Sequence, residues 1–152
     1  VVEGGRVRGS RLLGQTLARP EAHPEYFWGR PSAASVDLAT GLTVSGGSNL
    51  GPSSGVLRRA VSARIDALRA TGVTEAVPVD LVTASASGLD PHVSPAAARV
   101  QVPRVARARG LDEARVRQLV EESTEAPLAG VIGEPRVNVL RLNLALDRAT
   151  AR

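Results

Sequence analysis

The spacing of hydrophobic residues predicts a helix in the middle of the chain. Between residues 57 and 71, apolar side chains recur every three or four positions, as on one face of an α-helix. Ser53 or Ser54 is expected to cap its start, and Gly72 follows its expected end near Thr71. The apolar face of this helix consists of Leu57, Val61, Ile65 and Leu68.

A second helix is predicted from Ser94 onward. Ser94 supplies a capping hydroxyl, and Pro95 stands at the first helical position, where a missing N–H costs nothing. Pro103 is expected to break this helix and restart it, and Gly110 to end it.

Asp112 is expected to cap a third helix that follows a short turn. Leu111 and Val116 have the spacing of a hydrophobic staple at its start. This helix pair also has the spacing of a helix-turn-helix, which gives an alternative function in nucleic-acid binding. The residues of that motif are Ala106, Gly110, Val116 and Leu119. Several glutamates on the third helix would repel a DNA backbone, so we expect no nucleic-acid partner.

Strands are predicted in three places. Residues 1–8 are expected to form a small hairpin around Gly4 and Gly5. Residues 77–84 are a predicted strand, as are residues 137–144, where leucines alternate with polar residues. The alternating leucines are Leu140, Leu142 and Leu144.

The remaining segments have no clear periodicity. Residues 11–17 fit either a strand or a short helix, residues 19–31 an irregular segment, and residues 41–54 a loop. Together the elements predict one α+β domain, compact, with a small β-sheet and about three helices.

Composition narrows the classes of function. The chain has 152 residues, of which 43% are hydrophobic, and its only aromatic residues are Tyr26, Phe27 and Trp28. It has no cysteine, which excludes disulfides and thiol catalysis. All 19 basic residues are arginine, a pattern that we attribute to a GC-rich genome rather than to an anionic partner. No apolar run reaches the length of a membrane-spanning helix.

A loop rich in serine and glycine, at residues 45–54, is the first candidate for chemistry. Small residues leave backbone amides open to a phosphate, and the helix that follows adds a favourable dipole. However, the chain has no lysine to reach a phosphate, so we expect only weak nucleotide binding. The other interpretation is a rigid loop that packs on another subunit, in which case Asn49→Ala and Gly47→Val should leave the domain folded. The candidate nucleotide-binding residues are Ser45, Gly46, Gly47, Ser48 and Asn49.

A second polar loop covers residues 83–92. Ser85 or Ser87 with Asp90 and His92 resembles a nucleophile, an acid and a base. The Gly-x-Ser-x-Gly elbow of such sites is missing, so we expect Asp90 to make a local turn bond and assign no catalytic residue. His23 and His92 are the only histidines and have no second ligand at a metal-binding spacing.

Together the two loops resemble the C subunit of the Kdp-type potassium-transporting P-type ATPase. The resemblance covers residues 9–147. Further matching segments are Gly14-Gln15, Tyr26-Phe27, residues 29–33, Gln101-Val102, residues 104–106, residues 109–111, residues 133–140 and residues 142–147.

The resemblance implies a non-catalytic accessory subunit of an ATP-driven potassium uptake pump. Its partners would be the potassium-conducting and the ATP-hydrolysing subunits, whose complex it would stabilise. A role as a catalytic chaperone that raises ATP affinity is also implied, with residues 45–49 and either Gln15 or Gln101 as contacts. No tightly bound cofactor is expected. The candidate interface residues are Tyr26, Phe27, Arg30, Asn49, Leu50, Ser87, Leu89, Asp90 and His92.

The same resemblance implies a single-pass protein of the plasma (inner) membrane. We expect residues 1–8 to be a remnant that follows a membrane helix, residues 9–147 to form the soluble domain, and residues 148–152 to be a tail. A short basic N-terminus before that helix would place the domain on the extracytoplasmic face.

Overall fold

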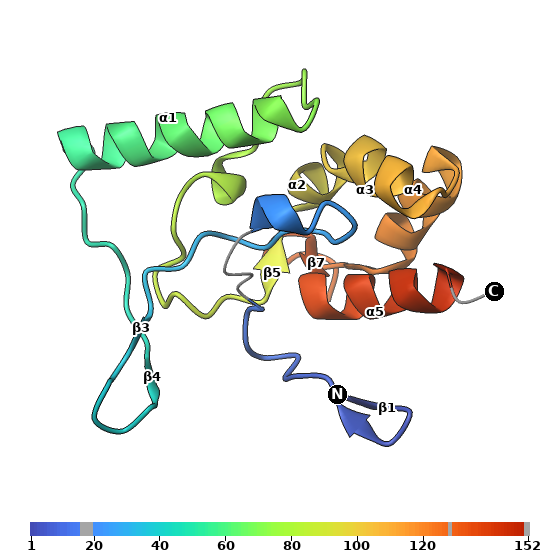
Figure 1. Ribbon diagram of the computed structural model, residues 1–152, viewed down its shortest axis with the longest axis horizontal. Helices are drawn as coiled ribbons and strands as arrows, with labels where there is room; N and C mark the ends of the chain where they lie inside the picture. Colours follow the sequence, from blue (N-terminus) through green and yellow to red (C-terminus); the bar gives the residue numbers. More distant parts are fainter. Residues whose placement is uncertain (16–19, 128, 151–152) are drawn as a thin grey trace.

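The computed structural model describes residues 1–15, 20–127 and 129–150 of the chain. Four helices, α2 (Pro95–Arg99), α3 (Val102–Arg109), α4 (Glu113–Glu122) and α5 (Val139–Thr150), surround a small central sheet in the described part of the chain. Helix α1 (Gly55–Ala70) and two hairpins extend from this body (Figure 1). This mixture of helices and short antiparallel strands confirms the predicted α+β class.

The N-terminal hairpin pairs β1 (Val2–Glu3) with β2 (Arg6–Val7), as predicted. Gly4 and Gly5 have φ of 57° and 74°, the left-handed conformations that a tight type I′ turn requires. Residues 11–13 of the undecided segment 11–17 form a turn, while residues 16 and 17 lie outside the described residues.

A second hairpin precedes the long helix. It pairs β3 (Ser35–Val36) with β4 (Thr43–Val44), so the prediction of a continuous loop over residues 41–54 was wrong at its start. The Asp37 carboxylate accepts hydrogen bonds from the amides of Ala39 and Thr40 and thereby closes the turn.

Helix α1 (Gly55–Ala70) begins and ends as predicted. The Ser54 hydroxyl accepts a hydrogen bond from the Leu57 amide, and Gly72 follows with a φ of 97°. Only Leu68 of this helix is buried, while Val61 and Ile65 pack against the core from its edge.

The strand predicted over residues 77–84 is wrong. The segment forms a 3₁₀ turn, η2 (Val79–Leu81), in which the amide and the hydroxyl of Thr83 both donate to the Val79 carbonyl. Pro78 starts this turn, and the Asp80 carboxylate accepts a hydrogen bond from the Ser94 amide at 2.7 Å. These local bonds satisfy backbone groups that a strand would have paired with a neighbour.

Three antiparallel strands form the central sheet in the order β5 (His92–Val93), β7 (Arg136–Asn138) and β6 (Thr124–Glu125). Val93 and Val137 lie opposite each other and are both buried. The sheet therefore contributes one apolar side to the core.

Helices α2 (Pro95–Arg99) and α3 (Val102–Arg109) are the two parts of the predicted broken helix. Ser94 caps α2, and Gly110 ends α3 in the left-handed conformation. Helix α4 (Glu113–Glu122) follows with Asp112 as its cap, again as predicted.

Helix α5 (Val139–Thr150) replaces most of the strand predicted over residues 137–144. The alternation of its leucines arises because a wide face of the helix is buried, and it does not indicate an extended backbone. Leu142 and Leu146 are fully buried, and Leu140 and Leu144 are nearly so. The helix reaches Thr150 and so includes the start of the predicted tail, residues 148–152.

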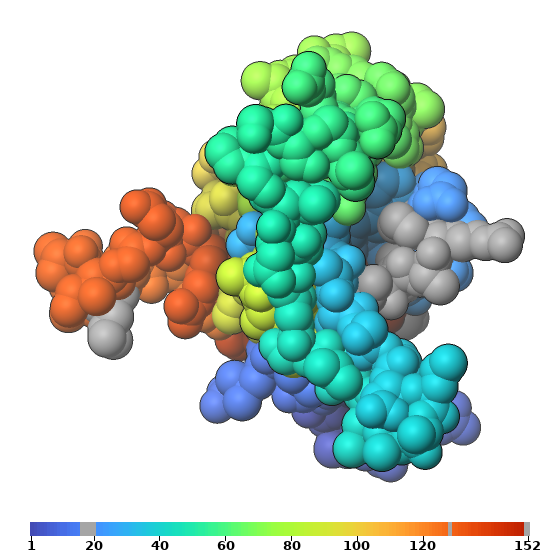
Figure 2. Space-filling view, turned by 90° about the vertical axis from the view of Figure 1, so that its left-hand side faces the viewer, coloured from blue at the N-terminus to red at the C-terminus, as the bar shows by residue number. Residues whose placement is uncertain are grey.

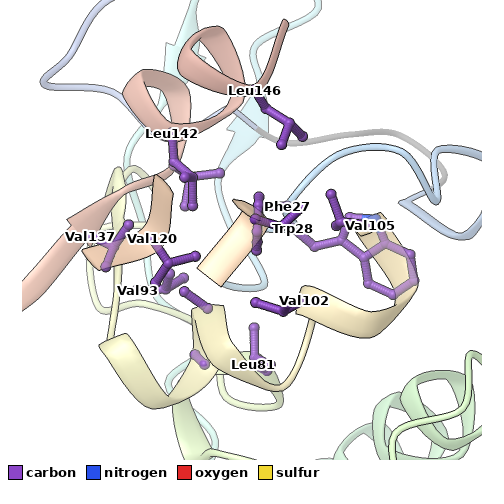
Figure 3. Packing of buried hydrophobic residues seen from close by; sticks show 14 of the residues in the cluster. Phe27, Trp28, Leu81, Val93, Val102, Val105, Val120, Val137, Leu142 and Leu146 are labelled. Atoms are coloured by element: carbon purple, nitrogen blue, oxygen red, sulfur yellow. The ribbon is translucent and has the colours of Figure 1, made fainter. Parts of the chain in front are cut away.

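The core lies between the sheet and the helices that cover it. Phe27 enters it from the N-terminal half and meets valines and leucines of β5, α3, α4 and α5 (Figure 3). The aromatic segment is thus part of the core and not only of the surface. The labelled core residues of Figure 3 are Phe27, Trp28, Leu81, Val93, Val102, Val105, Val120, Val137, Leu142 and Leu146.

Candidate functional site

The two polar loops singled out by the sequence contact each other. The Ser45 hydroxyl and the Gly46 amide both donate to the Ser87 carbonyl, at 2.8 and 2.9 Å. Residues 45–54 then run across an exposed face toward α1, beside residues 85–90 (Figure 2, teal to green beside yellow-green). We call residues 45–50 and 85–90 together the two-loop platform.

Glycines allow the two loops to touch through their backbones. A Cβ on Gly88 would lie 2.6 Å from the Ala34 nitrogen and 2.8 Å from the Gly46 carbonyl oxygen. A Cβ on Gly47 would lie 2.9 Å from the Ala86 carbonyl oxygen. Real Cβ atoms do not approach backbone so closely, so only glycine fits at these positions without movement.

This packing corrects one expectation. Gly47→Val was expected to leave the domain folded at little cost, but its side chain would collide with the Ala86 carbonyl. Asn49 and Leu50 are better probes of a partner surface, because both are exposed. Asn49 has a φ of 51°, a conformation that asparagine tolerates better than most residues.

Further contacts fix the platform to the rest of the chain. The Ser32 hydroxyl donates to the Gly88 carbonyl, and the Ser85 amide donates to the Pro31 carbonyl. On the other side, the Gly14 amide donates to the Leu89 carbonyl at 2.7 Å. Two segments distant in sequence, at residues 31–32 and at Gly14, therefore hold residues 85–90 in one shape.

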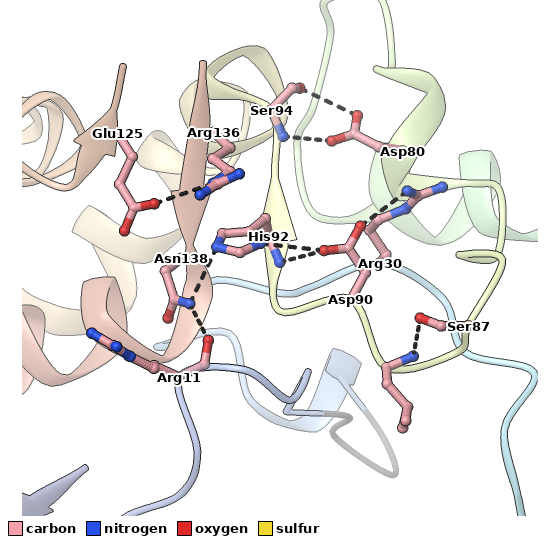
Figure 4. A network of polar contacts seen from close by, with 11 residues as sticks. Arg11, Arg30, Asp80, Ser87, Asp90, His92, Ser94, Glu125, Arg136 and Asn138 are labelled. Atoms are coloured by element: carbon pink, nitrogen blue, oxygen red, sulfur yellow. Dashed lines mark hydrogen bonds and ion pairs between the residues drawn. The ribbon is translucent and has the colours of Figure 1, made fainter. Parts of the chain in front are cut away.

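Arg30, Asp90 and His92 form one cluster at the end of the platform (Figure 4). One Asp90 oxygen lies 3.2 Å from Arg30 Nη1, and the other accepts a hydrogen bond from the His92 amide at 3.0 Å. The second bond is the local turn bond predicted for Asp90. His92 Nδ1 lies 3.4 Å from the same carboxylate.

The described residues contain no nucleophile joined to this cluster. Ser85 is buried, and the Ser87 hydroxyl accepts a hydrogen bond from the Leu89 amide. Neither serine is hydrogen-bonded to His92 in the part of the chain that the structure describes. Within the same ranges, no group of three or more acidic, histidine or cysteine residues could hold a metal ion.

The aromatic segment lies apart from the platform, against α3 and α5. Phe27 is 1% exposed, so its side chain offers no surface to a partner, whereas Tyr26 is half-buried with the Arg109 guanidinium 4.7 Å from its ring centroid. Asn143 receives the Phe27 amide on its oxygen and donates to the Phe27 carbonyl, which pairs this segment with α5.

Two buried polar residues, Gln101 and Arg104, hold this segment in place. The sequence did not reveal this structural role. The Gln101 oxygen accepts from the Trp28 amide and from Arg104, and its amide nitrogen donates to the Trp28 and Ala97 carbonyls. The Gln101 side chain is therefore fully used and is not free to contact ATP. Gln15, the other suggested contact, is exposed and donates to the Leu13 carbonyl.

Arg104 is a buried cation in this arrangement. It donates to the carbonyls of Pro24 and Tyr26, and its guanidinium lies 3.9 Å from the Trp28 ring centroid. Burial lowers the pKa of Arg104 to about 10, partly opposed by the charge of Glu25, so the side chain stays protonated at neutral pH. The hydrogen bonds of Arg104 identify it as a structural residue, and the spacing of residues in the sequence does not predict these bonds.

The helix pair α3–α4 has the hairpin shape that suggested the alternative function. Ala106, Val116 and Leu119 are buried between the helices, and Gly110 makes the turn. On the outer face, Arg117 pairs with Glu113, a turn before it in the helix. Glu113 thus offsets the positive charge of Arg117, the kind of charge that binding to a nucleic-acid backbone requires.

No described helix has both the length and the apolar character needed to cross a bilayer.

Comparison with known proteins gives a consistent result. The family model described as KdpC, the c chain of the K+-transporting ATPase, matches residues 1–148. A relative from Sorangium cellulosum (strain So ce56), named "Potassium-transporting ATPase KdpC subunit", is 61% identical over 151 residues, which cover 98% of this chain and 77% of the relative. Relatives with the same name from Burkholderia mallei (strain SAVP1) and Burkholderia pseudomallei (strain K96243) are each 56% identical over 153 aligned positions. The alignment covers 99% of this chain and 77% of each relative.

Proposed function

The chain belongs to the KdpC family of K+-transporting ATPase c chains, and from this premise we propose that it is a non-catalytic accessory subunit. In this proposal it stabilises the complex between a potassium-conducting subunit and an ATP-hydrolysing subunit of the pump. Helix-turn-helix binding of nucleic acid is not favoured, because the family is one of transport ATPase subunits.

The observation that carries this proposal is the interlocked two-loop platform. Its backbone contacts at Gly47 and Gly88 and its bonds to Ser87 hold exposed side chains such as Asn49 and Leu50 in one arrangement. A rigid surface loses little conformational entropy when a partner binds to it, so it favours stable association.

Absence of catalysis by this subunit is supported by how its polar groups are used. Asp90 is engaged by Arg30 and by the His92 amide, the Ser87 hydroxyl accepts a hydrogen bond from the Leu89 amide, and Ser85 is buried. Activation of a serine needs a base within hydrogen-bond distance, and none of the contacts just described supplies one.

Direct binding of ATP to residues 45–49 is the weaker part of the proposal. The Ser45 hydroxyl and the Gly46 amide already donate to Ser87, which leaves fewer donors for a phosphate. We expect a dissociation constant no tighter than about 1 mM, some 4 kcal/mol of binding free energy. An effect on the ATP affinity of the pump would then act through the partner subunits.

We further propose that this domain lies on the extracytoplasmic face of the membrane, near the entrance for potassium. The support is the N-terminal anchor that the family resemblance implies, together with the positive-inside rule for short loops.

The experiment is assembly of the pump from this subunit and its two large partners, followed by size-exclusion chromatography. Leu50→Asp should reduce the amount of assembled complex, because it places a charge in the proposed interface. The control is Val131→Asp, which changes another exposed aliphatic residue outside the platform. Full assembly with Leu50→Asp and Asn49→Ala, or equal loss with Val131→Asp, would contradict the proposal.

A further inference from the structure

A second site, apart from the platform, is formed where residues 11 and 12 cross the central sheet. A cavity of about 290 Å³ opens there, larger than a phosphate group needs. Its lining comes from the N-terminal segment, the strands and the start of α5. The lining residues are Arg11, Leu12, His92, Glu125, Arg136, Asn138 and Arg141.

Positive charge exceeds negative charge around this cavity. Three guanidiniums and one imidazole face a single carboxylate, which leaves an excess of two positive charges even when His92 is neutral. Glu125 is held by Arg136 Nε at 3.1 Å and by Arg141 Nη1 at 3.0 Å. Partial burial acts to raise the pKa of Glu125, but the hydrogen bond and charge of Arg136, together with the charges of His92 and Arg141, hold that pKa below its usual value.

Glu125 leaves most of the donors unused. Each guanidinium carries five N–H groups, and the carboxylate engages one nitrogen of Arg136 and one of Arg141. No hydrogen bond or ion pair joins the Arg11 guanidinium to a residue within the described ranges. The lining of the cavity therefore carries several charged donors that Glu125 does not engage.

A buried amide bonds to the backbone of two lining residues, Arg11 and Arg141, and lies next to His92. Asn138 is 3% exposed; its nitrogen donates to the Arg11 carbonyl at 2.8 Å and lies 3.5 Å from His92 Nε2 (Figure 4). Its oxygen accepts a hydrogen bond from the Arg141 amide at 3.1 Å. One side chain thus links three of the residues around the cavity before any ligand arrives.

We propose that this cavity, named here the arginine pocket, binds a phosphate-type oxyanion. Tetrahedral phosphate oxygens match several guanidinium forks at once, and their charge compensates the excess on the protein. The same chemistry is offered by free phosphate and by the phosphate of a lipid headgroup. The pocket is separate from residues 45–49, and the proposal does not depend on the assembly role.

The test is calorimetric titration of the 152-residue chain with inorganic phosphate at constant ionic strength. Arg11→Gln should weaken binding at least about tenfold, because it removes charge-assisted hydrogen bonds from the anion. Arg58→Gln is the matched control, since it removes the same charge from an exposed position on α1, and it should change binding less than about twofold.

A variant that is expected to bind phosphate more tightly, rather than more weakly, makes the test stricter. Glu125→Gln should tighten phosphate binding by several fold, because the carboxylate no longer competes for Arg136 and Arg141. Thermal melts of each variant establish that it is folded. No saturable binding, equal weakening by Arg58→Gln, or weaker binding in Glu125→Gln would overturn the proposal.

Vesicles distinguish the two sources of the phosphate. Phosphatidylcholine vesicles with and without phosphatidic acid are sedimented with the wild type and with Arg11→Gln. Capture that requires both phosphatidic acid and Arg11 would assign the pocket to a lipid headgroup, and phosphate binding without capture would assign it to the free anion. If neither probe binds, the pocket is not an anion site.

Discussion

At the scale of single residues, Gly88 and Gly110 show two different reasons why a position requires glycine: a left-handed backbone and the lack of room for a side chain. Their φ angles are 67° and 63°, so both adopt the left-handed conformation. A Cβ on Gly110 would meet nothing within 4 Å, whereas one on Gly88 would press on Ala34 and Gly46. The comparison therefore separates the close contacts of Gly88 with Ala34 and Gly46 from ordinary backbone strain.

We expect Gly110→Ala to lower the free energy of unfolding by about 1 kcal/mol, the usual cost of a left-handed alanine. Gly88→Ala should cost about 3 kcal/mol or more, because the backbone of the neighbouring loop must also move. Urea unfolding of both variants measures the difference. Equal losses would mean that Gly88 is not packed against Ala34 and Gly46 as described.

Glu125 gives a prediction about pH at the same scale. A carboxyl whose pKa is lowered by folding adds stability above its unfolded pKa, and this is lost as the pH falls through the folded pKa. Glu125→Gln should therefore destabilise the chain at pH 7 by up to about 1 kcal/mol, since the pair is partly exposed.

The difference between wild type and Glu125→Gln should shrink as the pH falls below about 4. Urea unfolding between pH 3 and pH 7 measures it, with Glu75→Gln, at an exposed position, as the control. A difference that stayed constant across this range would show that the ion pairs of Glu125 do not stabilise the fold.

At the scale of elements, local signals predicted the helices better than the strands. Caps at Ser54, Ser94 and Asp112 and the stop at Gly110 all follow from short-range hydrogen bonding that the sequence displays directly. The identity of α5 depends on what covers it, because a helix buried on a wide face gives the same alternation of leucines as a strand.

The candidate site divides in the same way. The sequence identified both polar loops, because they are rich in glycine, serine and asparagine. It did not show that Gly47 and Gly88 allow the two loops to pack against each other. Buried Gln101 and Arg104 could not be given their role from sequence, because it depends on the Trp28 amide, 73 positions from Gln101, and on the Pro24 carbonyl, 80 positions from Arg104.

The link between the aromatic segment and α3 can be tested by one substitution. Gln101→Leu keeps a similar volume but leaves the Trp28 amide and carbonyl without their side-chain partners. We expect a loss of about 3 kcal/mol in the free energy of unfolding, since buried polar groups become unsatisfied.

The control is Gln118→Leu on the exposed face of α4, which should change stability by less than about 0.5 kcal/mol. Trp28 is the only tryptophan, so its fluorescence reports on this segment directly. A Gln101→Leu variant as stable as the wild type would show that the segment is held by apolar packing alone.

At the scale of the whole molecule, two surfaces have different properties. The two-loop platform presents the exposed side chains of Asn49, Leu50 and Ser87, is largely uncharged and is held by backbone contacts, which suits a protein partner. The arginine pocket lies across the sheet and carries excess positive charge, which suits an anion. In our account, the first surface assembles the pump and the second binds a small ligand.

The most direct test of the assembly role is site-specific cross-linking, which the absence of cysteine in this chain makes straightforward. Leu50→Cys and Ser87→Cys place a photoactivatable cross-linker on the platform, and Arg115→Cys places it on the outer face of α4. In the assembled pump, we predict cross-links to a large subunit from positions 50 and 87 and none from position 115. Cross-links from position 115 alone would contradict the account.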